Sequence, residues 1–166
     1  MNLVVEDGTG VVGANSFASA DDMFLYAVDR NIDISNDPVI LEGLLVKAMD
    51  YIESISTRFN GVVKTAGQPL PFPRSVLSSY GLTVDIGVPA QIKKAQIILA
   101  IAATTTDLLP VQTAGAVMDV TRETVGPITV EYEKTAHTVT PRVPLADALL
   151  RPYIYGGSTQ PTVIRG

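Results

Sequence analysis

The segment from Asp37 to Thr57 constrains the fold more than any other part of this sequence, because it carries the main signals of an amphipathic helix. Asp37 can cap the helix with its carboxylate, and Pro38 suits the first helical position, where an N–H would lack a partner anyway. Apolar residues then recur at helical spacing and form one stripe: Leu41, Leu45, Ala48, Ile52 and Ile55. The sequence therefore predicts a helix here with one buried face.

A second helix is predicted before this one. It begins at Ser19, whose hydroxyl can cap the backbone, with Asp22 three residues later as a capping-box partner. It ends near Arg30. Apolar residues at helical spacing define one buried face: Ala20, Met23, Phe24 and Ala27.

A third helix is predicted from Pro89 to about Asp107, and its second half is apolar on nearly every side. Such a helix must be covered on all sides, by its own core on one face and by something else on the other. We expect a neighbouring subunit to supply that cover. The candidate subunit-interface residues are Ile97, Ile98 and Ile101.

Residues 60 to 88 are rich in residues that break helices and central strands: Gly61, Gly67, Pro69, Pro71, Pro73, Gly81 and Gly87. A long connection without regular structure is uncommon in a compact domain and usually serves a function. We therefore expect an ordered excursion that meets a partner. Phe72, Pro73 and Arg74 are its candidate docking residues.

The hydrophobic period changes from helical to two after residue 115. Met118 and Val120 alternate with polar residues, and Ile128, Val130 and Tyr132 do the same beyond Gly126 and Pro127. The sequence predicts a two-stranded hairpin over residues 117–133. Because a lone hairpin is only marginally stable, we expect it to pack on the helices or to join other copies of the chain.

The chain closes with a short predicted helix over residues 144–151 and a tail with few apolar residues over 152–166. We expect residues 1–151 to form one helical domain and the tail to be an extended docking arm. Its candidate docking residues are Tyr153, Tyr155, Val163, Ile164 and Arg165. The predicted fold class is mainly α, a small bundle of three to four helices with a β-hairpin and extended loops.

Charge is distributed unevenly along a chain with a net charge of −5. Residues 1 to 57 hold ten acids and two bases, whereas residues 58 to 166 hold ten bases and seven acids. The acidic balance argues against a main role in gripping nucleic-acid phosphates. Any contact with a polyanion should use the second part of the chain, through Arg58, Lys64, Arg74, Lys93 or Lys94; the alternative is that these residues form solvated surface.

Gly8, Gly10 and Gly13 have the spacing of a dinucleotide-binding motif. That motif needs a preceding strand, a helix that starts at the glycines and a parallel strand afterwards. Here the first helix cap, Ser19, comes six residues after the last glycine, and another helix follows. We therefore interpret the glycines as a flexible loop and expect no cofactor.

No set of residues for catalysis or metal binding can be assembled from the sequence. The chain has no cysteine, and its only histidine, His137, falls in a threonine-rich stretch without an orienting partner. We expect no catalytic and no metal-binding residues and no enzyme activity. The longest apolar run, Ile97 to Ala103, is far shorter than the roughly 20 residues that cross a bilayer, so we expect no membrane partner.

Taken in order, several segments resemble the family of bacteriophage head-to-tail connector proteins that are also labelled DnaT-like single-stranded-DNA-binding proteins. They include Ser16–Ser19, Ala48–Ile52, Phe59–Gly61, Gln68–Arg74, Val88–Pro89 and Val125–Tyr132. Two departures are Phe72, where the family usually has Trp, and Val63, where it often has Arg.

The resemblance implies a structural virion protein of the neck, made in the host cytoplasm. It implies a twelve-fold ring that binds beneath the portal, extends the DNA channel and provides the attachment surface for the tail. The implied partners are other copies, the portal, tail proteins, and double-stranded DNA that passes without tight binding. The alternative is a single-stranded-DNA-binding replication module, which would need aromatic stacking platforms among basic residues.

Overall fold

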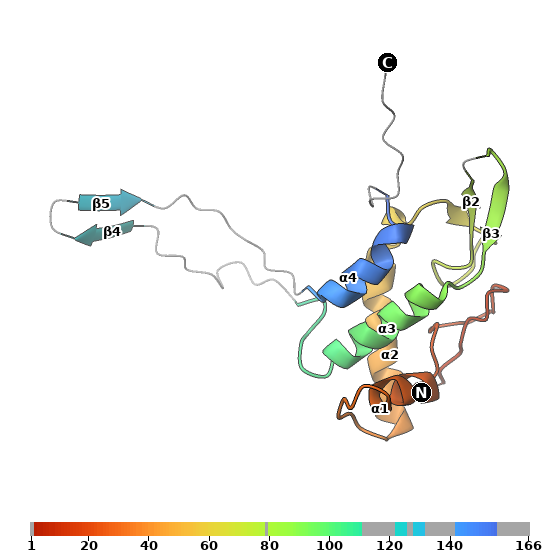
Figure 1. The fold of residues 1–166 in the computed structure, drawn as a ribbon, viewed down its shortest axis with the longest axis horizontal. Helices are drawn as coiled ribbons and strands as arrows, with labels where there is room; N and C mark the ends of the chain where they lie inside the picture. Colours follow the sequence, from red (N-terminus) through yellow and green to blue (C-terminus); the bar gives the residue numbers. More distant parts are fainter. Residues whose placement is uncertain (1, 79, 111–121, 126–127, 132–141, 156–166) are drawn as a thin grey trace, which may run out of the picture.

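Four helices form the body of the protein around one hydrophobic core, with a small antiparallel sheet beside them (Figure 1). The computed structural model describes residues 2–78, 80–110, 122–125, 128–131 and 142–155. The helices are α1 (Ala20–Val28), α2 (Pro38–Ser54), α3 (Ala90–Ala102) and α4 (Pro144–Leu150), with single 3₁₀ turns η1 (Ser56–Arg58) and η2 (Arg151–Tyr153). The strands are β1 (Val62–Val63), β2 (Arg74–Leu77), β3 (Thr83–Ile86), β4 (Arg122–Val125) and β5 (Ile128–Glu131). The predicted mainly helical class is confirmed.

The starts of α1 and α2 are confirmed with their caps. The Ser19 hydroxyl accepts the Asp22 N–H, and the Asp22 carboxylate accepts the Ser19 N–H, which completes a capping box. The Asp37 carboxylate accepts the Val39 N–H at 2.9 Å, and Pro38 is the first residue of α2. Helix α1 ends two residues before the predicted Arg30, and α2 gives way to η1 after Ser54.

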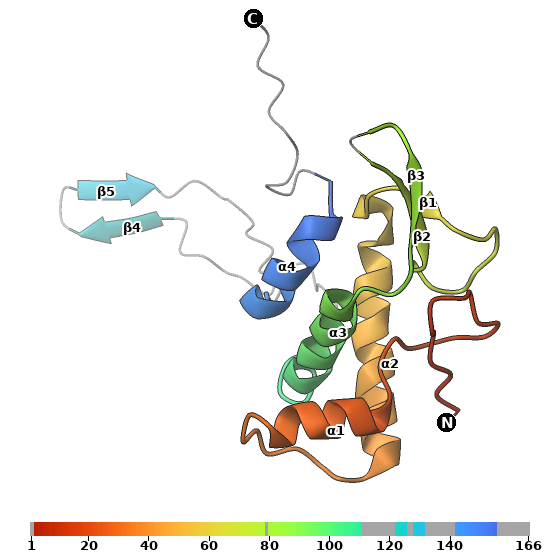
Figure 2. The same cartoon turned by 45° about the vertical axis from the view of Figure 1, so that its right-hand side comes forward.

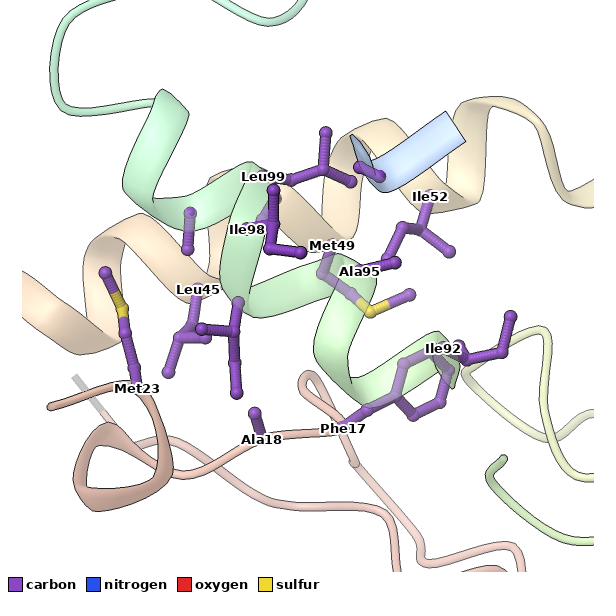
Figure 3. Packing of buried hydrophobic residues seen from close by; sticks show 14 of the residues in the cluster. Phe17, Ala18, Met23, Leu45, Met49, Ile52, Ile92, Ala95, Ile98 and Leu99 are labelled. Atoms are coloured by element: carbon purple, nitrogen blue, oxygen red, sulfur yellow. The ribbon is translucent and has the colours of Figure 1, made fainter. Parts of the chain in front are cut away.

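The core lies between α2 and α3 and is closed by the segment that precedes α1 (Figure 3). Leu45 and Met49 of α2 meet Ile92 and Leu99 of α3, and all four are fully buried. Phe17 reaches the same cluster from the N-terminal segment. Burial of one large apolar side chain contributes about 1.5–3 kcal/mol, so this cluster is a main source of stability.

Helix α3 packs against both α2 and α4, so its own chain covers two of its sides (Figures 1 and 2). Ile97 and Ile98 are buried, and Ile101 is half-buried against the same core. The expectation that a neighbouring subunit covers this face is corrected, because the chain's own core already buries Ile97 and Ile98, and Ile101 packs against that core. The helix also ends at Ala102, five residues early, where the Thr104 hydroxyl donates to the Ile101 carbonyl and competes with the helical pattern.

Residues 60 to 88 form a three-stranded antiparallel sheet in the order β1-β2-β3, so the expectation of an excursion without strands was wrong. Val62 pairs with Ser75, and Val76 pairs with Val84. The strands are only two to four residues long. They fit between the glycines and prolines, which lie in the connections, and such short strands leave no clear period-two signal.

Gly61 occupies the turn into β1 with a φ of +77°, and a Cβ there would lie 2.3 Å from the Ser75 carbonyl oxygen. We expect Gly61→Ala to lower the free energy of unfolding by about 2–3 kcal/mol, because it adds a backbone clash to the cost of a left-handed conformation. Gly67→Ala is the matched control: its φ is +79° and its Cβ would meet nothing within 4 Å. Urea unfolding gives the loss of stability in each variant, and the difference between the two losses is the cost of the clash. Equal losses would contradict the expectation.

The predicted β-hairpin is confirmed as β4 and β5, which pair antiparallel with Val125 opposite Ile128. Its first strand starts at Arg122, and Met118, Val120 and Tyr132 lie outside the described residues. The two strands contact each other and no other helix or strand that the structure describes. Among the described helices and strands, the hairpin therefore has none of the packing partners that a lone hairpin needs.

The first residues of the expected C-terminal tail are bound to the body. The Tyr153 carbonyl accepts the Asn60 N–H at 2.8 Å, Ile154 forms an isolated β-bridge with Phe59, and the Tyr155 N–H donates to the Arg58 carbonyl at 2.9 Å. The prediction of an extended arm that begins at residue 152 is therefore corrected, because residues 153–155 belong to the body. Val163, Ile164 and Arg165 lie outside the described residues.

Candidate interaction surfaces

The N-terminal glycine loop binds a carboxylate of its own chain. Buried Glu6 accepts the N–H groups of Gly8, Gly10 and Val11, each at 2.8 Å. These backbone donors are the groups that would cradle a phosphate in a dinucleotide site. Helix α1 starts at Ala20, well beyond the loop. The geometry therefore gives the glycines a structural role, which the sequence did not connect to Glu6.

Phe72, Pro73 and Arg74 are buried, so the expectation that they dock a partner is corrected. Phe72 lies at the centre of an aromatic cluster, with ring centroids 5.2 Å from Phe59, 6.2 Å from Phe17 and 6.1 Å from Tyr153, all edge to face. The sequence placed Phe72 in a breaker-rich segment and offered no period that would reveal this burial.

Arg74 is a buried cation held by main-chain carbonyls. Its guanidinium donates to Phe59, Asn60, Gly61 and Pro71 at 2.6–3.1 Å. Burial lowers the pKa of Arg74 from its ordinary value. Because all these donors are used within the chain, the expected polyanion contact at Arg74 is also corrected.

Gln96 joins three parts of the chain from inside the core. Its side-chain oxygen accepts the N–H groups of Phe17 and Ala18 at 2.8 and 3.1 Å. Its amide nitrogen donates to the Ser16 hydroxyl at 2.9 Å and to the Leu45 carbonyl at 3.0 Å. The sequence gives no sign of this role, because a fully bonded buried amide and an exposed one look alike in it.

Three groups of exposed residues are candidate interaction surfaces. The α1 surface comprises Phe24, Leu25, Val28, Ile32, Val39 and Ile40, on α1 and the start of α2. The sheet tip comprises Val62, Leu77, Tyr80, Leu82 and Val84. The α4 surface comprises Pro144, Leu145, Ala148, Arg151 and Pro152. Exposed apolar groups gathered in this way are typical of surfaces that contact other macromolecules.

The sequence missed the α1 surface because Phe24 was assigned to the buried face of its helix. Met23 and Ala27 are buried as predicted, whereas Phe24 is 36% and Leu25 61% exposed. The signal that could have revealed it is the spacing of Leu25, Val28 and Ile32, which forms a second apolar stripe beside the first.

Some of the basic residues that were predicted to contact a polyanion interact with acidic residues of the chain itself. Lys64 forms an ion pair with Asp85 at 3.4 Å, and Lys93 lies 3.9 Å from Asp22. Arg58 and Lys94 are exposed. Tyr155 is exposed, while half-buried Tyr153 donates its hydroxyl to Gln91 and packs on Phe72.

Among the described residues, no group of three His, Asp or Glu side chains could hold a metal ion. His137 lies outside those residues. No helix in the described part of the chain is long and apolar enough to cross a membrane.

Comparison with known proteins gives one family. No curated protein and no solved structure matches the chain. The profile of a family described as "Putative DnaT-like ssDNA binding protein", a description that names no catalytic activity, matches residues 1–166. The chain therefore belongs to this DnaT-like family.

Proposed function

We propose that this chain is a structural subunit of the ring that joins a bacteriophage head to its tail. In this role it binds beneath the portal, extends the DNA channel and provides the tail attachment surface. The observation that carries the proposal is the β4–β5 hairpin, which contacts no other described helix or strand of its chain. A hairpin of this kind needs a partner to be stable, and neighbouring subunits would supply it.

Two further features support a subunit role. The α1 surface and the α4 surface present apolar side chains on separate helices that do not contact each other, as the contacts between a subunit and two neighbours require. The identity of the assembly is supported by the resemblance of segments such as Gln68–Arg74 and Val125–Tyr132 to head-to-tail connectors.

A second candidate, single-stranded-DNA binding, is favoured by the description of the family. Such a site needs aromatic rings for base stacking along a basic groove. In the described part of the chain, Tyr80 is 89% exposed, but the positive charge of Lys64, which follows β1, is engaged in an ion pair with Asp85 of β3. The exposed acids of α1 and the following loop would repel phosphates.

Anisotropy of a labelled oligothymidine at physiological salt separates the two functions. We expect no binding tighter than about 10 µM, the range of non-specific phosphate contacts. The variant Tyr80→Ala serves as the control, because it removes the most exposed ring of the sheet tip. Sub-micromolar binding by the natural chain that is weakened in Tyr80→Ala would overturn the adaptor proposal in favour of the DNA-binding one.

A further inference from the structure

The α1 surface has an acidic border. Residues 20 to 42 contain six acids and one base, and Asp21, Asp29, Asp33 and Asp37 are exposed around the apolar side chains. The single base, Arg30, is engaged locally: its guanidinium carbon lies 3.6 Å from the centre of the Tyr26 ring, and Nη1 donates to the Tyr26 carbonyl at 3.1 Å. The surface therefore presents apolar groups inside a negative rim.

The lysines at the start of α3 lie on a different side of α1. Lys93 faces Asp22 at 3.9 Å, and the Lys94 ammonium lies 5.9 Å from the Tyr26 ring centre. Around the helix, Leu25 lies about 60° from Asp22 and about 100° from Tyr26, and Val28 lies about 120° and 160° from them. Among the described residues, the lysines of α3 form an ion pair with Asp22 alone, so the other carboxylates of the rim are not neutralised by them.

The α4 surface has the opposite character. Leu145 is 56% exposed, the exposed Ala148 lies about one turn further along α4, and the exposed Arg151 and Pro152 follow in η2. Arg142 is exposed just before α4 and Arg151 just after it. Two arginines thus flank α4 at its two ends, and the one carboxylate on the helix itself, that of Asp147, is half-buried.

We infer that the α1 surface of one copy binds the α4 surface of a second copy. The chain carries both halves of a complementary pair, apolar groups with an acidic rim on α1 and apolar groups with a basic rim on α4. These helices do not contact each other within the chain (Figure 2). A contact between two different surfaces of identical chains leaves one of each free, so it propagates head to tail, and it forms a ring where the rotation between neighbours closes. The α1–α1 and α4–α4 pairings would each bring like charges together, which disfavours them.

The inference rests on the proposed function only for ring closure, and its test needs no other protein. The chain has no cysteine, so single cysteines introduced by substitution can be cross-linked specifically. Leu25→Cys marks the α1 surface and Ala148→Cys the α4 surface, while Leu77→Cys, on the sheet tip, is a control at another exposed position. Pairs of variants are mixed at high concentration and treated with a short bismaleimide.

We expect the mixture of Leu25→Cys and Ala148→Cys to give at least about fivefold more cross-linked dimer than Leu25→Cys with Leu77→Cys, and the excess to fall in 1 M salt as charges are screened. A chain with both Leu25→Cys and Ala148→Cys should give a ladder beyond the dimer. Equal yields in all mixtures, or dominant Leu25–Leu25 dimers, would overturn the inference.

Charge reversal provides an independent readout. When Arg142→Glu and Arg151→Glu are added to the Ala148→Cys chain, its excess cross-linking to Leu25→Cys chains should be abolished. Adding Asp29→Arg and Asp33→Arg to the Leu25→Cys chain should then restore that cross-linking. Failure of this restoration would also overturn the pairing. If the double-cysteine chain gives a ladder but does not bind portal protein, the adaptor role is refuted and the contact between copies is supported. If the chain binds portal protein but gives no ladder, only the contact between copies is refuted.

Discussion

Replacing Phe72 by alanine is expected to lower the free energy of unfolding by about 3–5 kcal/mol, because it opens a cavity where three aromatic rings meet. Phe17, Phe59 and Tyr153 all contact the Phe72 ring edge to face. They come from the N-terminal segment, the residue after η1 and the last residue of η2. The ring therefore joins parts of the chain that are distant in sequence.

Guanidinium unfolding followed by circular dichroism measures this loss. The control is Tyr80→Ala, which truncates an aromatic ring that is 89% exposed and should change stability by less than about 0.5 kcal/mol. A loss below about 1 kcal/mol for Phe72→Ala would mean that Phe72 is not a core residue, and would reopen the docking role expected from the sequence.

Replacing Gln96 by leucine is expected to cost about 3–5 kcal/mol, although leucine is apolar and similar in size. The change strands the Phe17 N–H and removes one hydrogen bond each from the Leu45 carbonyl inside α2, the Ala18 N–H and the Ser16 hydroxyl, the last two keeping a bond to Ser16 Oγ and the Ala18 carbonyl. A buried group left without a partner costs about 1–3 kcal/mol and each further lost hydrogen bond about 0.5–1.5 kcal/mol, and local relaxation recovers part of the total.

Gln91→Leu is the matched control, because Gln91 is an exposed glutamine on the same helix whose side chain accepts only the Tyr153 hydroxyl. We expect it to lose less than about 1 kcal/mol. Hydrogen exchange at the Phe17 and Ala18 amides provides a local readout, since both should lose protection in Gln96→Leu. Unchanged stability and protection would show that the buried amide does not hold the N-terminal segment.

Local signals in the sequence predicted the elements that local chemistry determines. The Ser19–Asp22 and Asp37–Pro38 caps act within one turn, so the starts of α1 and α2 could be found from residue type and spacing. The β4–β5 hairpin was found from its alternation and its Gly-Pro connection. The class of the fold followed from these elements.

Contacts between distant segments could not be predicted in this way. Nothing near Ile97 or Ile98 reveals that the chain's own core buries them, and nothing near Phe72 reveals its aromatic neighbours. The Gln96 and Glu6 side chains look like ordinary polar residues until their backbone partners are placed around them. The candidate interface inferred from the structure is therefore on the outer sides of α1 and α4, whereas the sequence had indicated the second half of α3.

The central claim is that copies of this chain and a portal complete one another as a ring. The most direct test is the mass of the purified chain, alone and after mixing with portal protein, by native mass spectrometry. We expect a complex with a fixed number of chains per portal, in which Leu25→Cys and Ala148→Cys cross-link between neighbours. A chain whose mass stays unchanged in the presence of portal would contradict the claim.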